Sequence, residues 1–573
     1  MNLIPMPRTV ELTGATVAFR PAARRIDPSL PAQGYELHIE ESGVALVGAD
    51  DAGLLYGETT LAQLTRLGDG ALPAGVVRDH PDLPVRAVML DISRDKVPTT
   101  ATLEALIDRL ASLKVNQVQL YSEHTFAYRD HARVHAAASP LDGDEIRRLD
   151  AFCRARQVEL VPNQNCLGHM NRWLAHERYR PLALEPEGFV DPFGMARPPM
   201  TIDPANPASL ELVRSLLAEL LPHFSSRRVH VGLDEPWELP AGRFEEYLAW
   251  VRTLRALPEL DGYEMLMWGD MVAGHPERAA ALPAGVTVCE WGYEDWAPFD
   301  EHCAVLAEAD VPFWVAPGTS SWLTILGRIT NARGTCRRAA AAALAHGGSG
   351  FLNTDWGDNG HLQQPVISEP ALAYGAAVSW CLEANADIDL GAALSAHVFE
   401  DATGRLARAL LDLGDAHRLV TPQFPNMSTL VLHLYYPQLP VGRGLTLGLL
   451  DEELVAVERC LESARAEVEA SRPARADAAW VLDEARFSID LMSLLVADAR
   501  ARLRGDGSLG SVDPAERAEL GRTLDALIER YRDLWLRRNR PGGLDDSLAW
   551  LRNLRAAYAT GRPDPSWGGL TAP

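Results

Sequence analysis

The chain has 573 residues, enough for about three domains, and its 14 tryptophans favour well-buried cores. A formal net charge of −24 argues against nucleic acid or an anionic membrane as a partner. Lysine stands only at positions 96 and 114, so no phosphate-binding loop of the Walker type can form.

The N-terminus and the cysteines indicate the compartment. Residues 1–8 lack the basic segment and apolar run of a secretory signal, and no apolar stretch has transmembrane length. The seven cysteines are scattered and never form Cys-x-x-Cys, which excludes a disulfide framework and a thiolate zinc site. The missing signal and the scattered cysteines lead us to expect a cytoplasmic protein. Since the metal-binding patterns His-x-His and His-Glu-x-x-His are also absent, we expect no metal and no cofactor.

The first 80 residues predict a small α/β domain. Two alternating runs, 35–39 and 44–47, flank the turn residues Ser42-Gly43 and predict a hairpin. Asp51 then caps a helical stretch, and residues 79–84 have the composition of a linker.

Residues 84–388 predict a (β/α)8 barrel. Short apolar or β-branched runs alternate here with longer helical segments, as expected when parallel strands alternate with helices. The predicted strands are 87–90, 118–121, 158–161, 229–232, 265–268, 286–289, 313–316 and 350–353. The long Pro-rich connection 172–207 includes Trp173, Tyr179, Phe189 and Phe193, and we interpret it as a wall over the site.

Residues 389–573 predict a helical C-terminal domain. Leu454, Val457 and Leu461 recur at helical spacing, and Asp513-Pro514 is a typical helix start. This domain lacks a cluster of carboxylates and aromatics. We therefore expect it to serve structure or assembly, which is compatible with a homo-oligomer.

Polar and aromatic residues follow nearly every predicted strand, and the clearest case is Asp234-Glu235 after the run 228–231. In a parallel barrel the carboxyl ends of the strands hold the active site. Two adjacent carboxylates can take different roles there, although an Asp-Glu pair in an arbitrary chain most often lies in a solvated turn. Carboxylates beside tryptophan faces favour a sugar site, because hydroxyls need acceptors and the C–H face of a pyranose needs a flat wall.

These motifs resemble family 20 of the glycoside hydrolases, the β-N-acetylhexosaminidases, in the style of hexosaminidase D. The segment His230-x-Gly232-x-Asp234-Glu235 matches the family's acid motif, and Gly168-His169-Met170 matches a second one. Individual residues that match its sugar-binding positions are Arg86, Trp268, Trp291, Trp356 and Asp358, the last with Asp in place of Glu. The resemblance covers about two thirds of the chain and leaves out the helical C-terminal domain.

The resemblance implies an exo-acting, retaining enzyme whose substrate is a small glycoside or oligosaccharide. Glu235 would be the general acid, supported by His230 from the strand, and Asp234 would orient the substrate's 2-acetamido group, which attacks the anomeric carbon itself. The expected substrate-binding residues are Arg86, Glu123, His169, Trp268, Trp291, Tyr293, Trp322, Trp356 and Asp358.

Three strand exits depart from the family pattern. Ser122-Glu123 stands where many members have Asp-Asp, and 163–165 lacks the acidic partner of the histidine. The exit at 318–322 lacks the tyrosine that binds the acetamido carbonyl, a role left open between Tyr293 and Tyr128.

Two alternative functions remain open at this stage. The first is a glycosidase of the same fold that acts on another sugar with an enzyme carboxylate as nucleophile, for which Glu290, Glu123 and Asp355 are candidates. The second is a carbohydrate-binding protein without catalysis.

Overall fold

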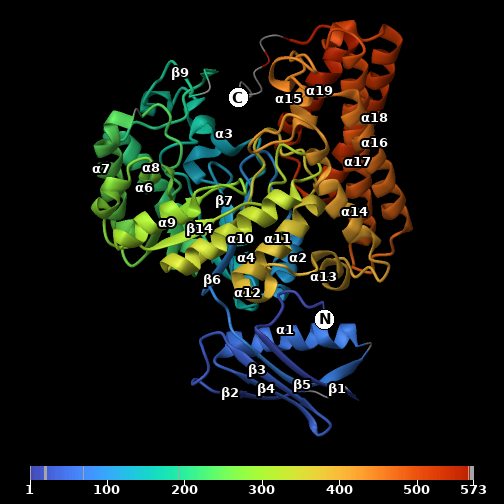
Figure 1. Ribbon diagram of the computed structural model, residues 1–573. Helices are drawn as coiled ribbons and strands as arrows, with labels where there is room; N and C mark the ends of the chain where they lie inside the picture. The colour runs from blue at the N-terminus through green and yellow to red at the C-terminus, as the bar shows by residue number, and fades with distance from the viewer. Residues whose placement is uncertain are drawn as a thin grey trace.

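The computed structural model describes residues 2–18, 22–68, 70–192, 194–239, 241–564 and 567. The chain first builds a small domain, drawn at the bottom of Figure 1, in which a five-stranded sheet of order β1-β5-β3-β4-β2 packs against helix α1. The predicted hairpin is the antiparallel pair β3–β4. The helix cap is Asp50 rather than Asp51, and its side chain accepts the Gly53 N–H. The bounds are β1 (Thr9–Ala18), β2 (Ala23–Ile26), β3 (Tyr35–Glu40), β4 (Gly43–Gly48), α1 (Asp51–Leu67) and β5 (Ala71–Asp79).

Eight parallel strands form the central barrel, in the order β11-β12-β13-β14-β15-β6-β7-β8. A parallel bridge between Asn163 and His230 links the two ends of this order and closes the ring. The predicted barrel is therefore confirmed. The strands are β6 (Val85–Asp91), β7 (Gln117–Tyr121), β8 (Glu159–Val161), β11 (Arg228–His230), β12 (Glu264–Trp268), β13 (Val286–Trp291), β14 (Phe313–Ala316) and β15 (Gly350–Asp355).

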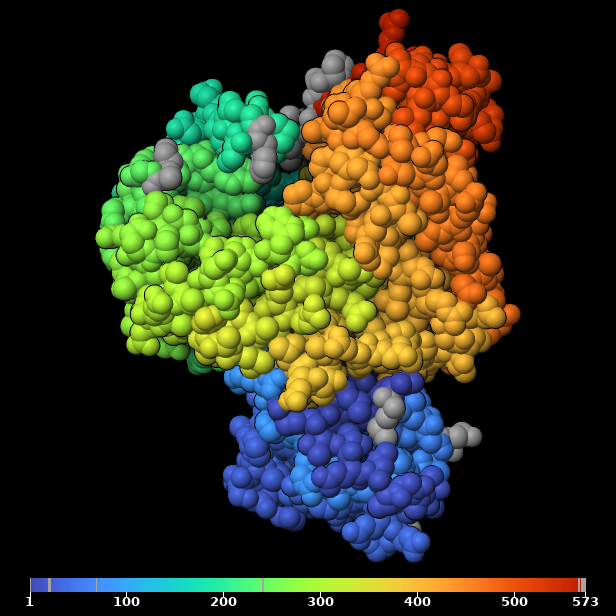
Figure 2. All heavy atoms as spheres, in the orientation of Figure 1, coloured from blue at the N-terminus to red at the C-terminus, as the bar shows by residue number. Residues whose placement is uncertain are grey.

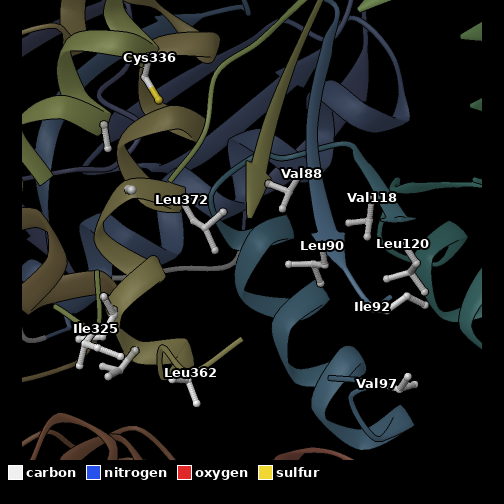
Figure 3. Packing of buried hydrophobic residues seen from close by; sticks show 14 of the residues in the cluster. Val88, Leu90, Ile92, Val97, Val118, Leu120, Ile325, Cys336, Leu362 and Leu372 are labelled. Atoms are coloured by element: carbon white, nitrogen blue, oxygen red, sulfur yellow. The ribbon is translucent and has the colours of Figure 1, made fainter. Parts of the chain in front are cut away.

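Helices surround the barrel and bury its outer face. Figure 3 shows Leu372 of α11 in one packed layer with Val88 and Leu90 of β6, all of them members of a single large core. The helices of this part are α2 (Thr100–Ser112), α3 (Ala132–His135), α4 (Gly143–Arg154), α5 (Asn171–Leu174), α6 (Pro207–Leu220), α7 (Phe244–Arg255), α8 (Asp270–Ala273), α9 (Phe299–Glu308), α10 (Ile329–His346) and α11 (Pro365–Trp380).

The predicted wall segment contains α5 and a short hairpin, β9 (Phe189–Val190) with β10 (Ala196–Arg197). Figure 1 places β9 on the side of the molecule opposite the small domain. Trp237, three residues after Asp234, lies 5.9 Å from the Arg197 guanidinium, so this segment borders the candidate site. Phe193 lies outside the described residues.

The chain beyond residue 380 is helical and lies along one side of the barrel, as the orange and red part of Figures 1 and 2 shows. Most of the buried hydrophobic residues that the structure describes in this part belong to the same cluster as those on the outer face of the barrel, whereas Cys381 packs in the core of the small domain. The helix start at Asp513 is as predicted, because its side chain accepts the Ala515 and Glu516 N–H groups. The helices are α12 (Leu382–Asn385), α13 (Leu390–His397), α14 (Arg405–Gly414), α15 (Leu432–Tyr435), α16 (Asp451–Ala470), α17 (Ala478–Leu503), α18 (Pro514–Arg538) and α19 (Leu544–Thr560).

A buried ion pair joins the small domain to the barrel. The Lys114 Nζ lies 2.9 Å from the Asp79 Oδ2, and both side chains are almost completely buried. Asp79 also accepts hydrogen bonds from the Tyr35 hydroxyl (2.7 Å) and the Trp380 indole N–H (2.9 Å). The segment predicted as a linker therefore begins with a residue that is fixed by three parts of the chain.

We expect Lys114→Met to lower the free energy of unfolding by about 3–5 kcal/mol, because it leaves the Asp79 carboxylate buried without its counter-charge. The matched control is Arg24→Met, which removes an exposed partner of Glu58 and should cost only about 0–1 kcal/mol. Thermal and urea unfolding of both variants measure the difference. Equal losses in the two variants would contradict the structural role of the buried pair.

Candidate active site

The carboxyl ends of the barrel strands bring aromatic and charged side chains together in one place. Tyr121, Trp268, Trp322 and Trp356 belong to a single cluster inside the barrel, and partly buried Trp291 and Tyr293 pack against it. The strand-exit pattern in the sequence thus corresponds to one site in space, as the barrel geometry requires.

The segment that carries Asp234 and Glu235 leaves β11 in an irregular conformation. Gly232, Leu233 and Glu235 have φ values of 70°, 75° and 45°. A Cβ at Gly232 would meet the Asn165 side chain, and a Cβ at Gly168 would meet the Asp234 carbonyl. Two glycines therefore permit close packing of the two loops. Non-glycine residues at positive φ cost about 1–3 kcal/mol each, and such strain concentrates at functional sites.

His169 lies between the two carboxylates and is itself at a positive φ of 54°. Its Nε2 is 3.1 Å from the Asp234 Oδ2 and 3.4 Å from the Glu235 Oε2. Burial lowers the pKa of this imidazole, but Asp234 and Glu235 outweigh burial, so the pKa is raised well above its usual value. The site therefore places a cation between Asp234 and Glu235.

The two carboxylates have different surroundings. Burial raises the pKa of Asp234, but His169 and Arg94 more than offset this, so the pKa is lowered and the group is ionised. The Asn165 amide donates to the Asp234 Oδ1 at 3.3 Å. The Glu235 side chain is 32% exposed and that of Asp234 only 12%, so Glu235 is the more accessible of the two.

Asp270 holds the backbone of Glu235 in place. Its Oδ2 accepts the Glu235 N–H at 3.0 Å, and its Oδ1 accepts the Trp291 indole N–H at 3.3 Å. Burial and the nearby Asp234 raise the pKa of Asp270 to about 7. Asp270 was not among the predicted site residues, although it stands two positions after a predicted strand end.

Arg94 lies against the aromatic cluster of the site and pairs with two carboxylates there. Its guanidinium lies 3.2 Å from Glu123 and 3.4 Å from Asp91, and it stacks over the rings of Tyr121 and Trp356 at 4.8 and 5.4 Å. Arg94 was not among the predicted site residues, but it too follows a strand exit, after Asp91.

The assignment of Arg86 to the sugar site is wrong. Arg86 stands at the amino end of β6, opposite the site, and is 1% exposed. Its guanidinium donates to the carbonyl oxygens of Leu83 (2.8 Å) and Lys114 (2.9 Å) and to the Tyr56 hydroxyl. Arg86 therefore joins the small domain to the barrel.

Asp358 lies in the loop after β15 at a φ of 44°. Burial raises the pKa of this carboxyl to about 7 against the opposing charge of Arg94, and the nearby Asp91 adds to the rise. Asp358 and Glu123 therefore both interact electrostatically with the Arg94 guanidinium.

Aromatic rings form the walls and floor of the site. Trp291 and Tyr293 are stacked, with centroids 5.1 Å apart and planes 19° apart, and the Trp356 indole N–H donates to the Tyr293 hydroxyl at 2.8 Å. Trp268 and Trp322 are only 1% exposed and lie behind these rings. Trp322 packs edge-on against Tyr293 and donates its N–H to Asn426.

His230 and Tyr128 lie away from the reacting groups. The His230 Nδ1 accepts the Gly232 N–H at 3.1 Å, the ring contacts Trp268 at 4.5 Å, and burial lowers the pKa of the imidazole to about 3. This neutral ring supports the segment that leads to Asp234. Tyr128 donates to the Gln164 Oε1 and lies outside the aromatic cluster, whereas Tyr293 packs against that cluster.

Two of the three alternative nucleophiles face away from the site. The Glu290 Oε1 lies 2.6 Å from the Nδ1 of His302, on the outer helix α9. Asp355 accepts hydrogen bonds from the hydroxyls of Thr319, Ser321 and Ser368, the last on the outer helix α11. Glu123 does face the site, where it pairs with Arg94 and accepts the Tyr121 hydroxyl.

In the described part of the chain, no three His, Cys, Asp or Glu side chains are arranged to hold a metal ion. None of the helices that the described residues form combines the length and the apolar character needed to cross a bilayer.

Curated relatives match parts of the chain. A β-hexosaminidase of Akkermansia muciniphila is 29% identical over 42% of this chain and 52% of its own length. A lacto-N-biosidase of Bifidobacterium bifidum is 27% identical over 35% of this chain and 17% of its own length. Hexosaminidase D of Bos taurus is 25% identical over 36% of this chain and 63% of its own length. The chain thus spans about half or less of the first two relatives.

Solved structures share the fold. The GH20 β-N-acetylhexosaminidase from Streptomyces coelicolor superposes with a TM-score of 0.56 and 20% identity over 69% of this chain and 96% of that one. A mutant β-hexosaminidase from Streptomyces plicatus in complex with GlcNAc superposes with a TM-score of 0.55 and 20% identity over 69% and 95%.

Two family models match more than half of the chain between them. Residues 22–80 match domain 2 of glycosyl hydrolase family 20, and residues 84–326 match the catalytic domain of the same family. The resemblance drawn from the motifs is thereby confirmed, and the chain belongs to glycosyl hydrolase family 20.

Proposed function

We propose that this protein is an exo-acting β-N-acetylhexosaminidase that removes terminal β-linked N-acetylhexosamine with retention of anomeric configuration. The observation that carries this proposal is the arrangement of Asp234, His169 and Glu235, in which one histidine nitrogen lies 3.1–3.4 Å from both carboxylates. The substrate class agrees with what the curated hexosaminidase relatives are named for.

Glu235 is the general acid in this proposal. It protonates the glycosidic oxygen as the bond to the anomeric carbon breaks, and a bound pyranose would cover its partly exposed carboxyl. At the same time the substrate's acetamido carbonyl oxygen attacks the anomeric carbon, so a cyclic oxazolinium ion forms and the leaving group departs as an alcohol. Water then opens this ion at the anomeric carbon and gives up its proton to Glu235, which returns the enzyme to its starting state.

Asp234 acts on the acetamido group. An ionised carboxylate can accept the acetamido N–H and offset the positive charge that develops on the ring of the intermediate. Tyr293, beside Trp356 on the opposite wall, is the donor we assign to the acetamido carbonyl. The other residues proposed to hold the sugar are Arg94, Glu123, Trp291, Trp356 and Asp358.

Exo action is inferred from the buried floor of the site. Trp268 is 1% exposed and Trp356 is 8% exposed, and Arg94 covers the Trp356 ring. We therefore expect the sugar ring to end against this floor, with the leaving group directed out of the barrel.

We expect Glu235→Gln to keep the fold and the affinity for the sugar but to lower kcat by about 10²–10⁴-fold on glycosides with poor leaving groups. Aryl glycosides with good leaving groups need less protonation and should lose less. Steady-state kinetics on the two kinds of substrate measure this, with Glu245→Gln on the surface of α7 as control. Equal losses on both substrates would count against the acid assignment.

We expect Asp234→Asn to lower kcat by about 10²–10³-fold, because the amide keeps the shape of the carboxylate but loses its charge. NMR of the first-formed product should show retention in the wild-type enzyme. Inversion would indicate direct attack by water instead of substrate assistance. A covalent ester on Glu123, trapped by a fluoro-sugar, would indicate an enzyme nucleophile. Sugar binding without any turnover would instead indicate a carbohydrate-binding protein.

We expect Arg94→Lys to lower kcat/KM by about 10- to 100-fold, because lysine keeps the charge beside Glu123 but loses the planar fork that can hold two sugar oxygens. Arg86→Lys is the matched control at the other end of the same strand. It should lower Tm and leave kcat/KM of the folded enzyme within about threefold, since Arg86 bonds to carbonyls far from the site. If Arg86→Lys lowered kcat/KM by about 10-fold or more and Arg94→Lys left it unchanged, Arg86 would belong to the sugar site and Arg94 would not.

A further inference from the structure

The loop after β6 lies between the active site and the C-terminal helices. Arg94 faces the site, and the residues that follow it bond to the segment between α18 and α19. The Arg540 N–H donates to the Val97 carbonyl at 2.8 Å, and Pro98 forms a β-bridge with Asn539. The Thr99 N–H donates to the Arg538 carbonyl at 2.9 Å. The chain therefore runs from the site's arginine directly into a backbone contact with the C-terminal domain.

Asp95, next to Arg94, packs against Gly543. It has a φ of 71°, and a Cβ at Gly543 would meet its carbonyl group. Gly543 is itself at a φ of 76°, immediately before α19. A strained residue keeps its conformation only when its surroundings impose it, and α19 supplies part of those surroundings.

One arginine joins this loop to the loop that carries His169. The Arg172 Nη2 lies 3.2 Å from the Asp95 Oδ1 and 2.9 Å from the Asp546 Oδ2 in the first turn of α19. Arg172 stands three residues after His169, at the start of α5. A single guanidinium thus links the histidine segment, the Arg94 segment and the C-terminal domain.

The loop after β15, which carries Trp356 and Asp358, has the same kind of support. The Ser547 hydroxyl of α19 donates to the Gly360 carbonyl, and the Tyr531 hydroxyl of α18 donates to the His361 carbonyl at 3.1 Å. A Cβ at Gly360 would meet the Trp550 ring. Helices α18 and α19 therefore contact the loops after three barrel strands, and all three loops carry site residues.

We propose that α18 and α19 are a positioning part of the active site, and that Asp546 acts through Arg172 and Asp95 to hold His169 and Arg94 in their working geometry. Asp546 is a positioning residue, because it touches neither the substrate nor the reacting carboxylates. The expected change in kcat rests on the proposed function. The expected change in loop geometry rests on the contacts of Arg172 with Asp95 and Asp546 alone. Helices α18 and α19 lie outside the segments matched by the family models, so the proposal gives a role in catalysis to a part of the chain that those models do not cover.

The variant that tests it is Asp546→Asn, with Asp545→Asn as matched control. Asp545 lies in the same helix turn, but its side chain is 81% exposed and pairs with Arg552 on the surface. Asp546→Asn should lower kcat on alkyl N-acetylhexosaminides about 10-fold and on aryl substrates with good leaving groups by less than about 3-fold. The His169 Nε2 contacts the Glu235 Oε2 at 3.4 Å, so a displaced His169 leaves the Glu235 carboxyl misplaced, and a misplaced acid costs most where the leaving group needs a proton. Tm should stay within about 2 °C of wild type, since the pair is partly exposed.

Asp546→Glu keeps the charge and should recover most of the alkyl-glycoside activity that Asp546→Asn loses. The control Asp545→Asn should match wild type on both substrates. If Asp546→Asn and Asp545→Asn give the same dependence on the leaving group, or if Asp546→Glu behaves like Asp546→Asn, the proposal is overturned.

Hydrogen exchange separates this proposal from the proposed function. Amides of residues 94–97 and 169–174 should exchange faster in Asp546→Asn than in Asp545→Asn, whatever the substrate. If the wild-type protein had no activity on N-acetylhexosaminides, the proposed function would be overturned. The exchange data would then still test whether Asp546 holds the loops that carry His169 and Arg94. Unchanged exchange in Asp546→Asn would overturn that role.

Discussion

Two cations hold the acidic active site together. Asp91, Glu123, Asp234, Glu235 and Asp358 meet at the carboxyl end of the barrel, where so many carboxylates would repel one another in a low dielectric. Arg94 pairs with Asp91 and Glu123, and His169 lies between Asp234 and Glu235. The pairing keeps Asp234 ionised, while the pKa of Asp358 is raised to about 7. Glu235, the proposed acid, and Asp234, the proposed partner of the acetamido group, can therefore be neighbours in the chain.

Backbone strain fixes where these charges lie. Positive φ values occur at Asp95, His169, Glu235 and Asp358, which lie in four different loops that meet at the site. Close contacts impose them: Gly168 packs against the Asp234 carbonyl, Asp270 accepts the Glu235 N–H, and Gly543 packs against Asp95. The third of these contacts comes from the C-terminal domain, which links the helices around residue 543 to the geometry of the loops at the candidate site.

The barrel could be predicted from the sequence because parallel strands are buried on both faces and appear as continuous apolar runs. The run at 229–232 ends two residues earlier in the structure, since Gly232 and Leu233 turn into left-handed conformations that hydrophobicity does not reveal. The strand-exit pattern pointed to Asp234, Glu235, His169 and Trp356 correctly as neighbours. The same pattern contained Arg94 and Asp270, whereas Arg86 stands at the amino end of its strand and therefore belongs to the opposite end of the barrel.

Contacts between distant segments could not be predicted from one sequence. Asp79 looks like a linker residue because its partners Lys114 and Trp380 are 35 and 301 positions away. The link from Asp546 to Arg172 spans 374 positions. Neither leaves a local pattern, since a charged residue on a helix is usually solvated.

We propose that the site is built for the cyclised intermediate formed by the substrate's own acetamido group. The most direct test is the Kd of an N-acetylglucosamine-thiazoline analogue, measured by calorimetry beside the Kd of N-acetylglucosamine. The account predicts that the thiazoline, which mimics the intermediate, binds at least about 10²-fold more tightly than the product sugar. Affinities within a few-fold of each other would contradict it.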